Sequence, residues 1–173
     1  FAQNENGING VAVIDLTNGN RSIISKWDGS VGSGNILNGS MGRVTYDASR
    51  NRFIVMDSPS GRLLGVDAKS GLRTDLSLVL HGFGYITHDK YRDRVYNFDL
   101  NVGYVDLKTL SSEYIGDYED DTNYFLDSYF GGVLTDQGKS FYMHVRLKPE
   151  YSDDGVEIPN GYAVVKHHID SSY

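Results

Sequence analysis

Acidic residues are concentrated in two stretches of the sequence that also contain tyrosines. The first is GDYEDDTNYFLDSYF at 116–130 and the second is RLKPEYSDDGVEIPN at 146–160. Ca²⁺ takes about six to eight oxygen ligands from groups of this kind, and acid plus tyrosine also suits a cationic or sugar-like ligand. Neither stretch has the ligand spacing of a calcium-binding hand, and acidic loops of an acidic protein are usually only solvated. The candidate metal ligands are Asp117, Asp120, Asp121, Asp153 and Asp154.

Imidazole chemistry is limited to five histidines. His88 lies at the end of a predicted strand, and it can face Arg43 and Tyr46 of an equivalent strand. A catalytic role would require an acid or a metal in reach, and a histidine in such a place is more often structural. His167 and His168 are adjacent in a predicted strand, so they point to opposite faces and cannot chelate one ion together.

One pattern of residues occurs repeatedly along the chain. GRVTYDASRNRFIVMDSPSGRLLGVDAKSGLRTDLS at 42–77 is followed by GYITHDKYRDRVYNFDLNVGYVDLKTLSSEYIG at 84–116, and a looser copy starts with GGVLTDQGKSFYMHV at 131. Asp47, Asp89 and Asp136 hold the same place in these copies, 42 and 47 residues apart. Such a period is typical of a propeller blade, a four-stranded unit of roughly 40 to 50 residues.

The three repeated aspartates have two interpretations. They could form a ring of carboxylates that binds a ligand. Because each follows a predicted strand at the start of a turn, capping of that turn by the side chain is the better explanation.

The composition and the turn residues predict an all-β protein. The chain has 20 Gly, 13 Tyr and 3 Pro, and no window sustains the apolar spacing of an amphipathic helix. VGSGNILNG at 31–39 lacks the Lys-Ser or Lys-Thr of a phosphate-binding loop, so it is predicted to be an ordinary connection. The predicted strands are 43–46, 52–56, 63–67 and 73–76 in the first copy, and 85–88, 94–98, 103–107 and 113–115 in the second.

The repeat resembles the blades of the NHL, YVTN and gluconolactonase-like propeller superfamily. The resemblance is carried by an inner strand ending in Tyr-Asp or His-Asp, then Asn-Arg-Phe-Ile-Val-Met-Asp, then Gly-Val-Asp-Ala-Lys-Ser-Gly. It implies a ligand site at one mouth of a central channel, built from the connections between strands. The single tryptophan could stack on a ligand there or pack between blades. The candidate ligand-binding residues are Trp27, Arg43, Tyr46, Tyr85, His88 and Tyr129.

The ends of the sequence predict incomplete blades. VAVIDLTNGNRSIIS at 11–25 matches the third and fourth strands of a blade, and GYAVVKHHID at 161–170 matches a third strand with no fourth after it. We therefore expect one partial propeller domain over 1–173, with blade segments at about 1–26, 41–77, 83–116 and 130–173. These are three to four four-stranded antiparallel blades of a six- or seven-bladed ring, and the rest of a parent chain or another chain would supply the missing blades.

Charge and cysteine content exclude several functions. The net charge of -7 argues against nucleic acid as a partner, because phosphates require patches of Lys and Arg. With no Cys there is no thiolate nucleophile, thiolate metal site or disulfide. No apolar run is long enough to span a membrane. The compartment is not determined, and a secreted or periplasmic location is the expectation.

Three function classes remain. The leading one is a non-catalytic propeller that binds a protein, peptide or carbohydrate on its loop face. The second is a metal-dependent lactonase or hydrolase, for which the resemblance implies Glu, Asn and Asp around a divalent cation, although no blade start here has a matching Glu. The third is a structural repeat module of a larger secreted or surface protein. Ca²⁺ is the one candidate cofactor.

Overall fold

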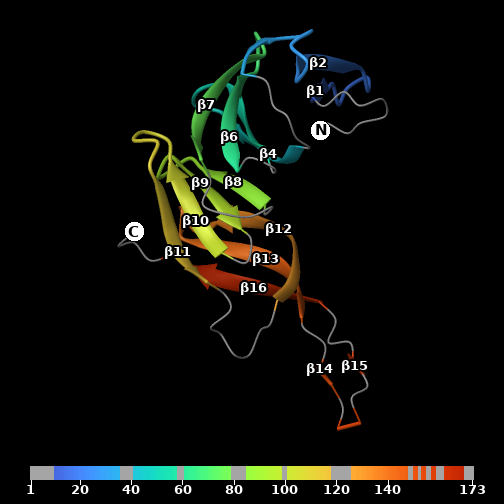
Figure 1. The fold of residues 1–173 in the computed structure, drawn as a ribbon, viewed down its shortest axis with the longest axis vertical. Helices are drawn as coiled ribbons and strands as arrows, with labels where there is room; N and C mark the ends of the chain where they lie inside the picture. Colours follow the sequence, from blue (N-terminus) through green and yellow to red (C-terminus); the bar gives the residue numbers. More distant parts are fainter. Residues whose placement is uncertain are drawn as a thin grey trace. The chain divides into compact units, whose positions relative to one another are not determined.

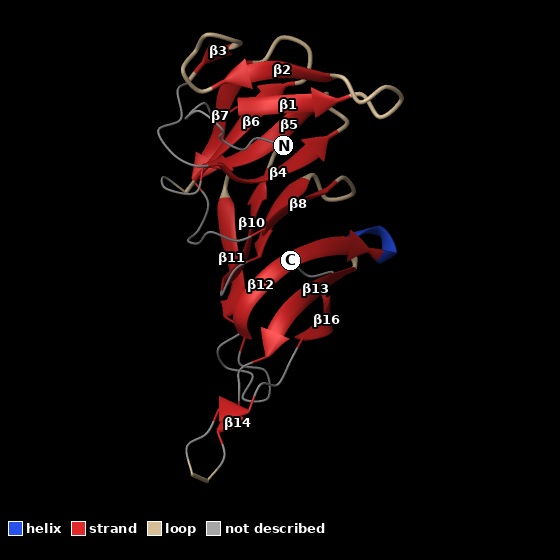
Figure 2. Cartoon of the chain, turned by 90° about the vertical axis from the view of Figure 1, so that its right-hand side faces the viewer, coloured by secondary structure: helices blue, strands red, loops and turns tan. Residues whose placement is uncertain are grey.

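The computed structural model divides the chain into two compact units, Phe1–Val79 and Leu80–Tyr173. It describes residues 10–35, 41–57, 61–78, 85–98, 101–117, 126–147, 150–151, 153–154, 157–158 and 162–169. Within these ranges the regular structure consists of β-strands and one 3₁₀ turn at Asp136–Gly138, which confirms the all-β prediction (Figures 1 and 2). The described part of the chain contains no helix with the length and hydropathy needed to cross a bilayer.

The main sheet of the first unit has the strand order β3-β7-β6-β5-β4. Its four long strands follow one another along the chain, and each pairs antiparallel with the next. They coincide with the four strands predicted in the first copy of the repeat, which are confirmed. Their bounds are Met41–Asp47 (β4), Arg52–Asp57 (β5), Arg62–Asp67 (β6) and Leu72–Leu78 (β7).

A fifth strand, Ser33–Gly34 (β3), pairs parallel with β7. The prediction of an ordinary connection at 31–39 is therefore wrong for these residues. Gly34 has a φ of +94°, and a Cβ atom there would lie 2.2 Å from the carbonyl oxygen of Arg73. Glycine is required because a side chain would prevent this close approach of the two backbones.

The first unit also contains a hairpin of Gly10–Ile14 (β1) and Arg21–Lys26 (β2), as predicted for the third and fourth strands of a blade. The core of this unit is mainly aliphatic. Each of its central side chains is at most 4% exposed, and they are Val11, Trp27, Val55, Leu64 and Val66.

The first sheet of the second unit is a four-stranded antiparallel sheet in the order β11-β10-β9-β8. It confirms the four strands predicted in the second copy of the repeat. Their bounds are Tyr85–Asp89 (β8), Arg94–Phe98 (β9), Asn101–Asp106 (β10) and Ser112–Asp117 (β11).

The last sheet has the order β12-β13-β16, with bounds Leu126–Thr135, Ser140–Leu147 and Tyr162–His168. The connection predicted at 116–130 is too long, because β11 continues to Asp117 and β12 already begins at Leu126. Asp127 consequently lies in a strand. The aromatic and β-branched residues of LDSYFGGVLT favour an extended backbone and explain the early start of β12.

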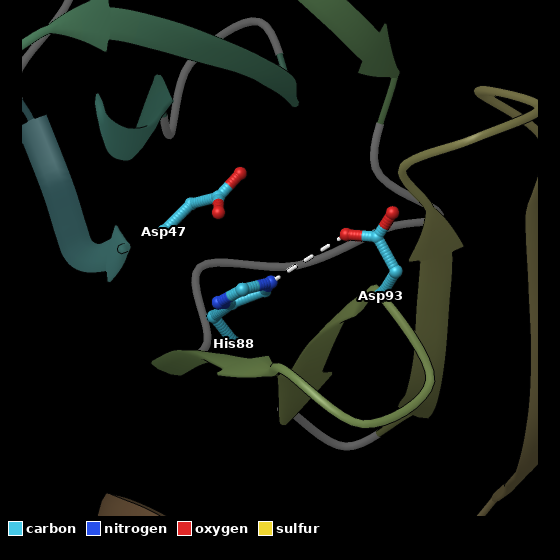
Figure 3. Close-up of side chains that lie close together, drawn as sticks. All are labelled: Asp47, His88 and Asp93. Atoms are coloured by element: carbon cyan, nitrogen blue, oxygen red, sulfur yellow. Dashed lines mark ion pairs between the residues drawn. The ribbon is translucent and has the colours of Figure 1, made fainter. Parts of the chain in front are cut away.

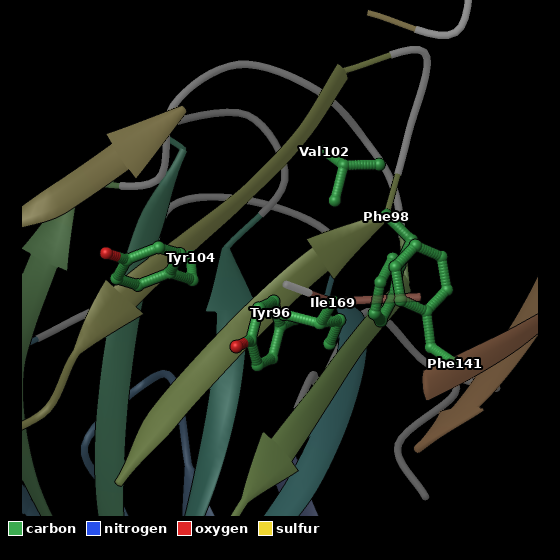
Figure 4. Packing of buried hydrophobic residues seen from close by; sticks show 6 residues of the cluster. All are labelled: Tyr96, Phe98, Val102, Tyr104, Phe141 and Ile169. Atoms are coloured by element: carbon green, nitrogen blue, oxygen red, sulfur yellow. The ribbon is translucent and has the colours of Figure 1, made fainter. Parts of the chain in front are cut away.

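The core of the second unit is aromatic (Figure 4). Strand alternation places Tyr96 and Phe98 of β9 on one face, beside Tyr104 and Val102 of β10. Phe98 packs against Phe141 of β13 with ring centroids 4.5 Å apart, so the β8–β11 sheet and the last sheet share this core. A close aromatic pair contributes about 0.5 to 1.5 kcal/mol beyond the area it buries.

Candidate functional site

Asp47 caps the turn between β4 and β5. Its Oδ1 accepts hydrogen bonds from the backbone N of Ser49 at 3.1 Å and from the hydroxyl of Ser49 at 2.6 Å. Its Oδ2 accepts one from Arg50 Nη1 and one from Arg52 Nε, each at 3.0 Å. The side chain is fully buried, so this carboxylate is committed to the turn and to the two arginines.

Asp89 has the same role between β8 and β9. Its Oδ1 accepts from the backbone N of Tyr91 at 2.9 Å and its Oδ2 from Arg92 Nη1 at 3.1 Å. Arg92 Nη1 also donates to the carbonyl oxygen of Gly138 at 2.6 Å. The capping interpretation is confirmed for Asp47 and Asp89, while the side chain of Asp136 lies outside the described residues.

The turns between the third and fourth strands use a second set of aspartates. Asp67 Oδ1 accepts from the backbone N of Ser70 at 2.6 Å and from its hydroxyl at 2.7 Å. These two hydrogen bonds lower the pKa of Asp67, and the one from the backbone has the larger effect. The pKa of Asp106 is lowered mainly by a hydrogen bond from the backbone N of Thr109. The pKa of Asp15 is lowered mainly by a hydrogen bond from the hydroxyl of Thr17. The repeat contains these residues, but their capping role was not predicted.

Strand alternation separates the candidate ligand residues on each inner strand. The register of β4 with β5 is one to one from Arg43 to Tyr46, so these two side chains lie on opposite faces of β4. Tyr46 donates its hydroxyl to Asn51 Oδ1 at 2.8 Å. By the same alternation, Tyr85 and His88 lie on opposite faces of β8.

His88 lies near a carboxylate of its own unit. Its Nε2 is 3.8 Å from Oδ1 of Asp93, and the two side chains are 5% and 16% exposed (Figure 3). This separation is longer than a hydrogen bond, so the pair is electrostatic and depends on protonation of the imidazole. Asp93 has a φ of 59°, in the left-handed region that aspartate tolerates.

The remaining candidate residues belong to different elements of the chain. Trp27 is 4% exposed and packs in the core of the first unit. Tyr129 lies in β12, and its side chain is not described. Asp117 is the last residue of β11, while Asp120 and Asp121 lie outside the described residues.

Asp153 and Asp154 are both exposed and belong to an insertion between β13 and β16. The equivalent connection is 58–61 in the first unit and 99–100 in the β8–β11 sheet, whereas here it is 148–161. The insertion contains its own hairpin, Glu150–Tyr151 (β14) paired with Glu157–Ile158 (β15). Figure 1 shows this hairpin extending beyond the ends of β13 and β16.

A buried arginine is a feature that sequence analysis missed. Arg73 of β7 is 2% exposed. Its Nε donates to the carbonyl oxygen of Asn35 at 2.7 Å, and its Nη1 donates to Ser25 Oγ at 2.6 Å and to the carbonyl oxygen of Lys26 at 2.8 Å. In the sequence, Arg73 is the basic residue two positions after the Gly of the repeated turn. Arg21 has the same place after its own turn and is exposed, so the local sequence did not show that Arg73 would be buried.

Arg94 forms a second cluster, in the second unit. Its guanidinium carbon is 4.0 Å from the centre of the Tyr104 ring, and its Nε is 3.8 Å from Oδ2 of Asp106. Tyr104 donates its hydroxyl to Glu113. Burial, followed by this hydrogen bond, raises the pKa of Tyr104 to about 12. The phenol therefore stays neutral, and the cluster contributes packing rather than acid–base chemistry.

No protein-family profile and no curated protein sequence matches the chain. Solved structures do match. A protein of unknown function from Bacteroides thetaiotaomicron has 16% identity and a TM-score of 0.62 over 83% of this chain and 38% of that one. A candidate 6-phosphogluconolactonase from Bacteroides uniformis has 14% identity and a TM-score of 0.56 over 93% of this chain and 52% of that one. A nidogen/laminin complex has 18% identity and a TM-score of 0.45 over 66% of this chain and 41% of that one.

The fold is that of a β-propeller. The antiparallel strands β4–β7 and β8–β11 have the form of its four-stranded blades, and the likeness to the solved structures shows this fold alone. The chain spans 38% and 52% of the two Bacteroides structures. Identities this low carry the fold and no activity.

Proposed function

We propose that this chain is a non-catalytic β-propeller binding module that uses the β14–β15 hairpin to bind a basic segment of a protein or peptide. The observation that carries the proposal is the insertion at 148–161, which replaces the short connections at 58–61 and 99–100. In rigid β-scaffolds, recognition is usually carried by the connections between strands. A connection extended by a hairpin of its own is the strongest departure from the repeat.

The charge of the hairpin indicates the class of partner. The sequence of 148–161 is KPEYSDDGVEIPNG, with four carboxylates, one lysine and one tyrosine. The described pair Asp153 and Asp154 is exposed. A short segment that contains several carboxylates and a tyrosine suits Lys and Arg side chains, which form ion pairs and cation–π contacts. A basic peptide therefore fits this surface better than a neutral sugar.

The chemistry of the other candidates also supports binding over catalysis. The carboxylates of Asp47 and Asp89 are already occupied by turn amides and arginines.

The test is calorimetric binding of a hexalysine peptide at low salt to the full chain and to the double variant D153N/D154N. Two exposed ion pairs correspond to about a fivefold loss of affinity. The matched control is D15N/D28N, which changes the net charge equally but alters exposed turns of the first unit. Equal losses in both variants would mean unspecific attraction to an acidic protein and would refute the proposal.

The same surface is where we propose the predicted Ca²⁺ site. Its candidate ligands were given above, and of these Asp153 and Asp154 lie together in the turn of the hairpin. Millimolar Ca²⁺, but not Mg²⁺, should raise the melting temperature of the wild type and not that of D153N/D154N. An unchanged melting temperature in the wild type would remove the metal and leave the peptide-binding proposal intact.

A further inference from the structure

The turn between β10 and β11 has a leucine where the equivalent turn of the first unit has a glycine. The backbone N of Leu110 donates to the carbonyl oxygen of Asp106 at 2.8 Å. In the first unit, the backbone N of Gly71 donates to the carbonyl oxygen of Asp67 at 2.9 Å. The φ angles are 58° at Leu110 and 70° at Gly71. This left-handed conformation has no steric cost for glycine, whereas a leucine is strained in it.

The strain at Leu110 is not matched by burial, because the residue is 45% exposed. The turn between β8 and β9 contains a second exposed apolar residue, Tyr91, which is 59% exposed. Ser49 has the place of Tyr91 in the first unit, since the backbone N of each donates to the aspartate two positions earlier. Both turns of the β8–β11 sheet thus present a large apolar side chain where the first unit has a small residue. A strained and exposed apolar residue contributes little to folding and indicates a binding role.

The two turns lie side by side at one end of the sheet. Strands β9 and β10 are neighbours, and Arg94 at the start of β9 is opposite Asp106 at the end of β10. The backbone N of Leu107 donates to the carbonyl oxygen of Asp93 at 2.9 Å, which joins the turns directly. The two exposed apolar side chains therefore belong to one surface.

The exposed charges of these two turns are positive. Lys90 and Lys108 are exposed, and Lys90 Nζ lies 5.0 Å from the centre of the Tyr91 ring. The aspartates at these turns have side chains that are at most 21% exposed, and they are Asp89, Asp93 and Asp106. The surface is therefore locally basic, although the whole chain has a net charge of -7.

We propose that these two turns form a second binding surface, which takes an acidic protein segment that carries an apolar side chain. This turn surface is defined by Lys90, Tyr91, Lys108 and Leu110. Its lysines pair with carboxylates of the partner, while the tyrosine and the leucine bury the partner's apolar side chain. Such a contact gives Leu110 the burial that the chain alone does not provide.

The turn surface lies at the opposite end of the second unit from the β14–β15 hairpin. Arg92 follows Tyr91, and its Nη1 donates to the carbonyl oxygen of Gly138 at 2.6 Å. Gly138 ends the 3₁₀ turn that precedes β13, whereas the hairpin follows β13. Figure 2 shows this 3₁₀ turn, in blue, and β14 at opposite ends of β13. The inference therefore does not depend on the function proposed for the hairpin.

The experiment measures by calorimetry the binding of a synthetic peptide, four glutamates around one phenylalanine, to the full chain. The variant Y91S/L110G installs the residues of the first unit and should weaken binding about tenfold, because an apolar contact is lost. Its melting temperature should stay within about 3 °C of the wild type, since glycine relieves the strain at this position. A peptide with serine in place of phenylalanine should bind the wild type about tenfold more weakly than the original.

Charge variants provide the control and keep the test valid if Y91S/L110G folds poorly. K90Q/K108Q should weaken binding about fivefold, the value for two exposed ion pairs. The matched control R21Q/K69Q removes two exposed cations of the first unit and should leave the affinity unchanged. Equal losses in both charge variants, or no saturable binding by the wild type, would overturn the proposal. Binding to phosphatidylserine vesicles in place of the peptide would assign the surface to a membrane and would also overturn it.

Discussion

The β4–β7 sheet and the β8–β11 sheet have the same strand order and the same aspartate caps, yet in the described part of the chain the first has a fifth strand and the second has four. The registers show a difference at one equivalent position of the described strands. Arg73 of β7 lies opposite Val66, and Ser112 of β11 lies opposite the equivalent Val105. The guanidinium binds the stretch that contains β3, and a serine hydroxyl is too short to do so. The guanidinium of Arg73 therefore links β7 to the backbone of the stretch that contains β3.

The largest expected effect comes from Arg73→Ser, which installs the residue of the second sheet. It leaves the carbonyl oxygens of Lys26 and Asn35 and the hydroxyl of Ser25 without their charged donor. We expect the free energy of unfolding to fall by about 3 kcal/mol or more, and the amides of 31–35 to exchange faster with solvent.

The matched control is Arg21→Ser, because Arg21 follows the first repeated turn and is exposed. It should change the free energy of unfolding by less than about 0.5 kcal/mol in a urea titration. A loss below about 1 kcal/mol for Arg73→Ser would show that β3 is held by its backbone pairing instead.

An intermediate effect separates the two aspartate caps. Asp47 accepts from Arg50 and Arg52, whereas Asp89 accepts from Arg92. Asp47→Asn should therefore lower the free energy of unfolding by about 2 to 3 kcal/mol, and Asp89→Asn by about 1 to 2 kcal/mol. Chemical denaturation of both variants measures the difference, and the reverse order would mean that Arg52 contributes nothing to the cap.

The smallest effect concerns the exposed turn aspartates. Hydrogen bonds from Ser70 lower the pKa of Asp67 below its ordinary value of 3.8. A lowered pKa in the folded state contributes stability above the unfolded value, and this stability is lost as the pH falls through the folded value. The stability difference between wild type and Asp67→Asn should be constant above about pH 5 and shrink below about pH 4. Urea titrations from pH 7 to 2.5 test this, and a constant difference throughout would contradict it.

The strands and the caps at Asp47 and Asp89 could be predicted because the interactions that form them are local. Each of these aspartates accepts hydrogen bonds from the backbone amides two and three positions later. An Asp directly after a strand, followed three positions later by Arg, is therefore visible in the sequence. The early start of β12 and the strand β3 could not be predicted in this way. In the sequence, Gly34 looked like a loop residue. The structure requires glycine there because the backbone of Arg73, 39 positions later in the sequence, passes close to it.

The candidate site shows the same division. The insertion predicted at 146–160 was visible as a departure from the repeat, and the structure shows that the connection at 148–161 contains a hairpin. The candidate ligand residues Arg43 and Tyr46 lie on opposite faces of β4, and Tyr85 and His88 lie on opposite faces of β8, because side chains alternate along a strand.

The sequence by itself determined the period of the repeat, the positions of the strands β4 to β11, the caps at Asp47 and Asp89 and the acidic character of the insertion before β16, because each depends on neighbours a few residues apart. The tertiary structure decided which arginine is buried, which strand edge gains a partner, and how far the His88 imidazole lies from the Asp93 carboxylate. These depend on distances of a few ångströms between backbones and side chains. Such distances are set only when the sheets have formed and packed.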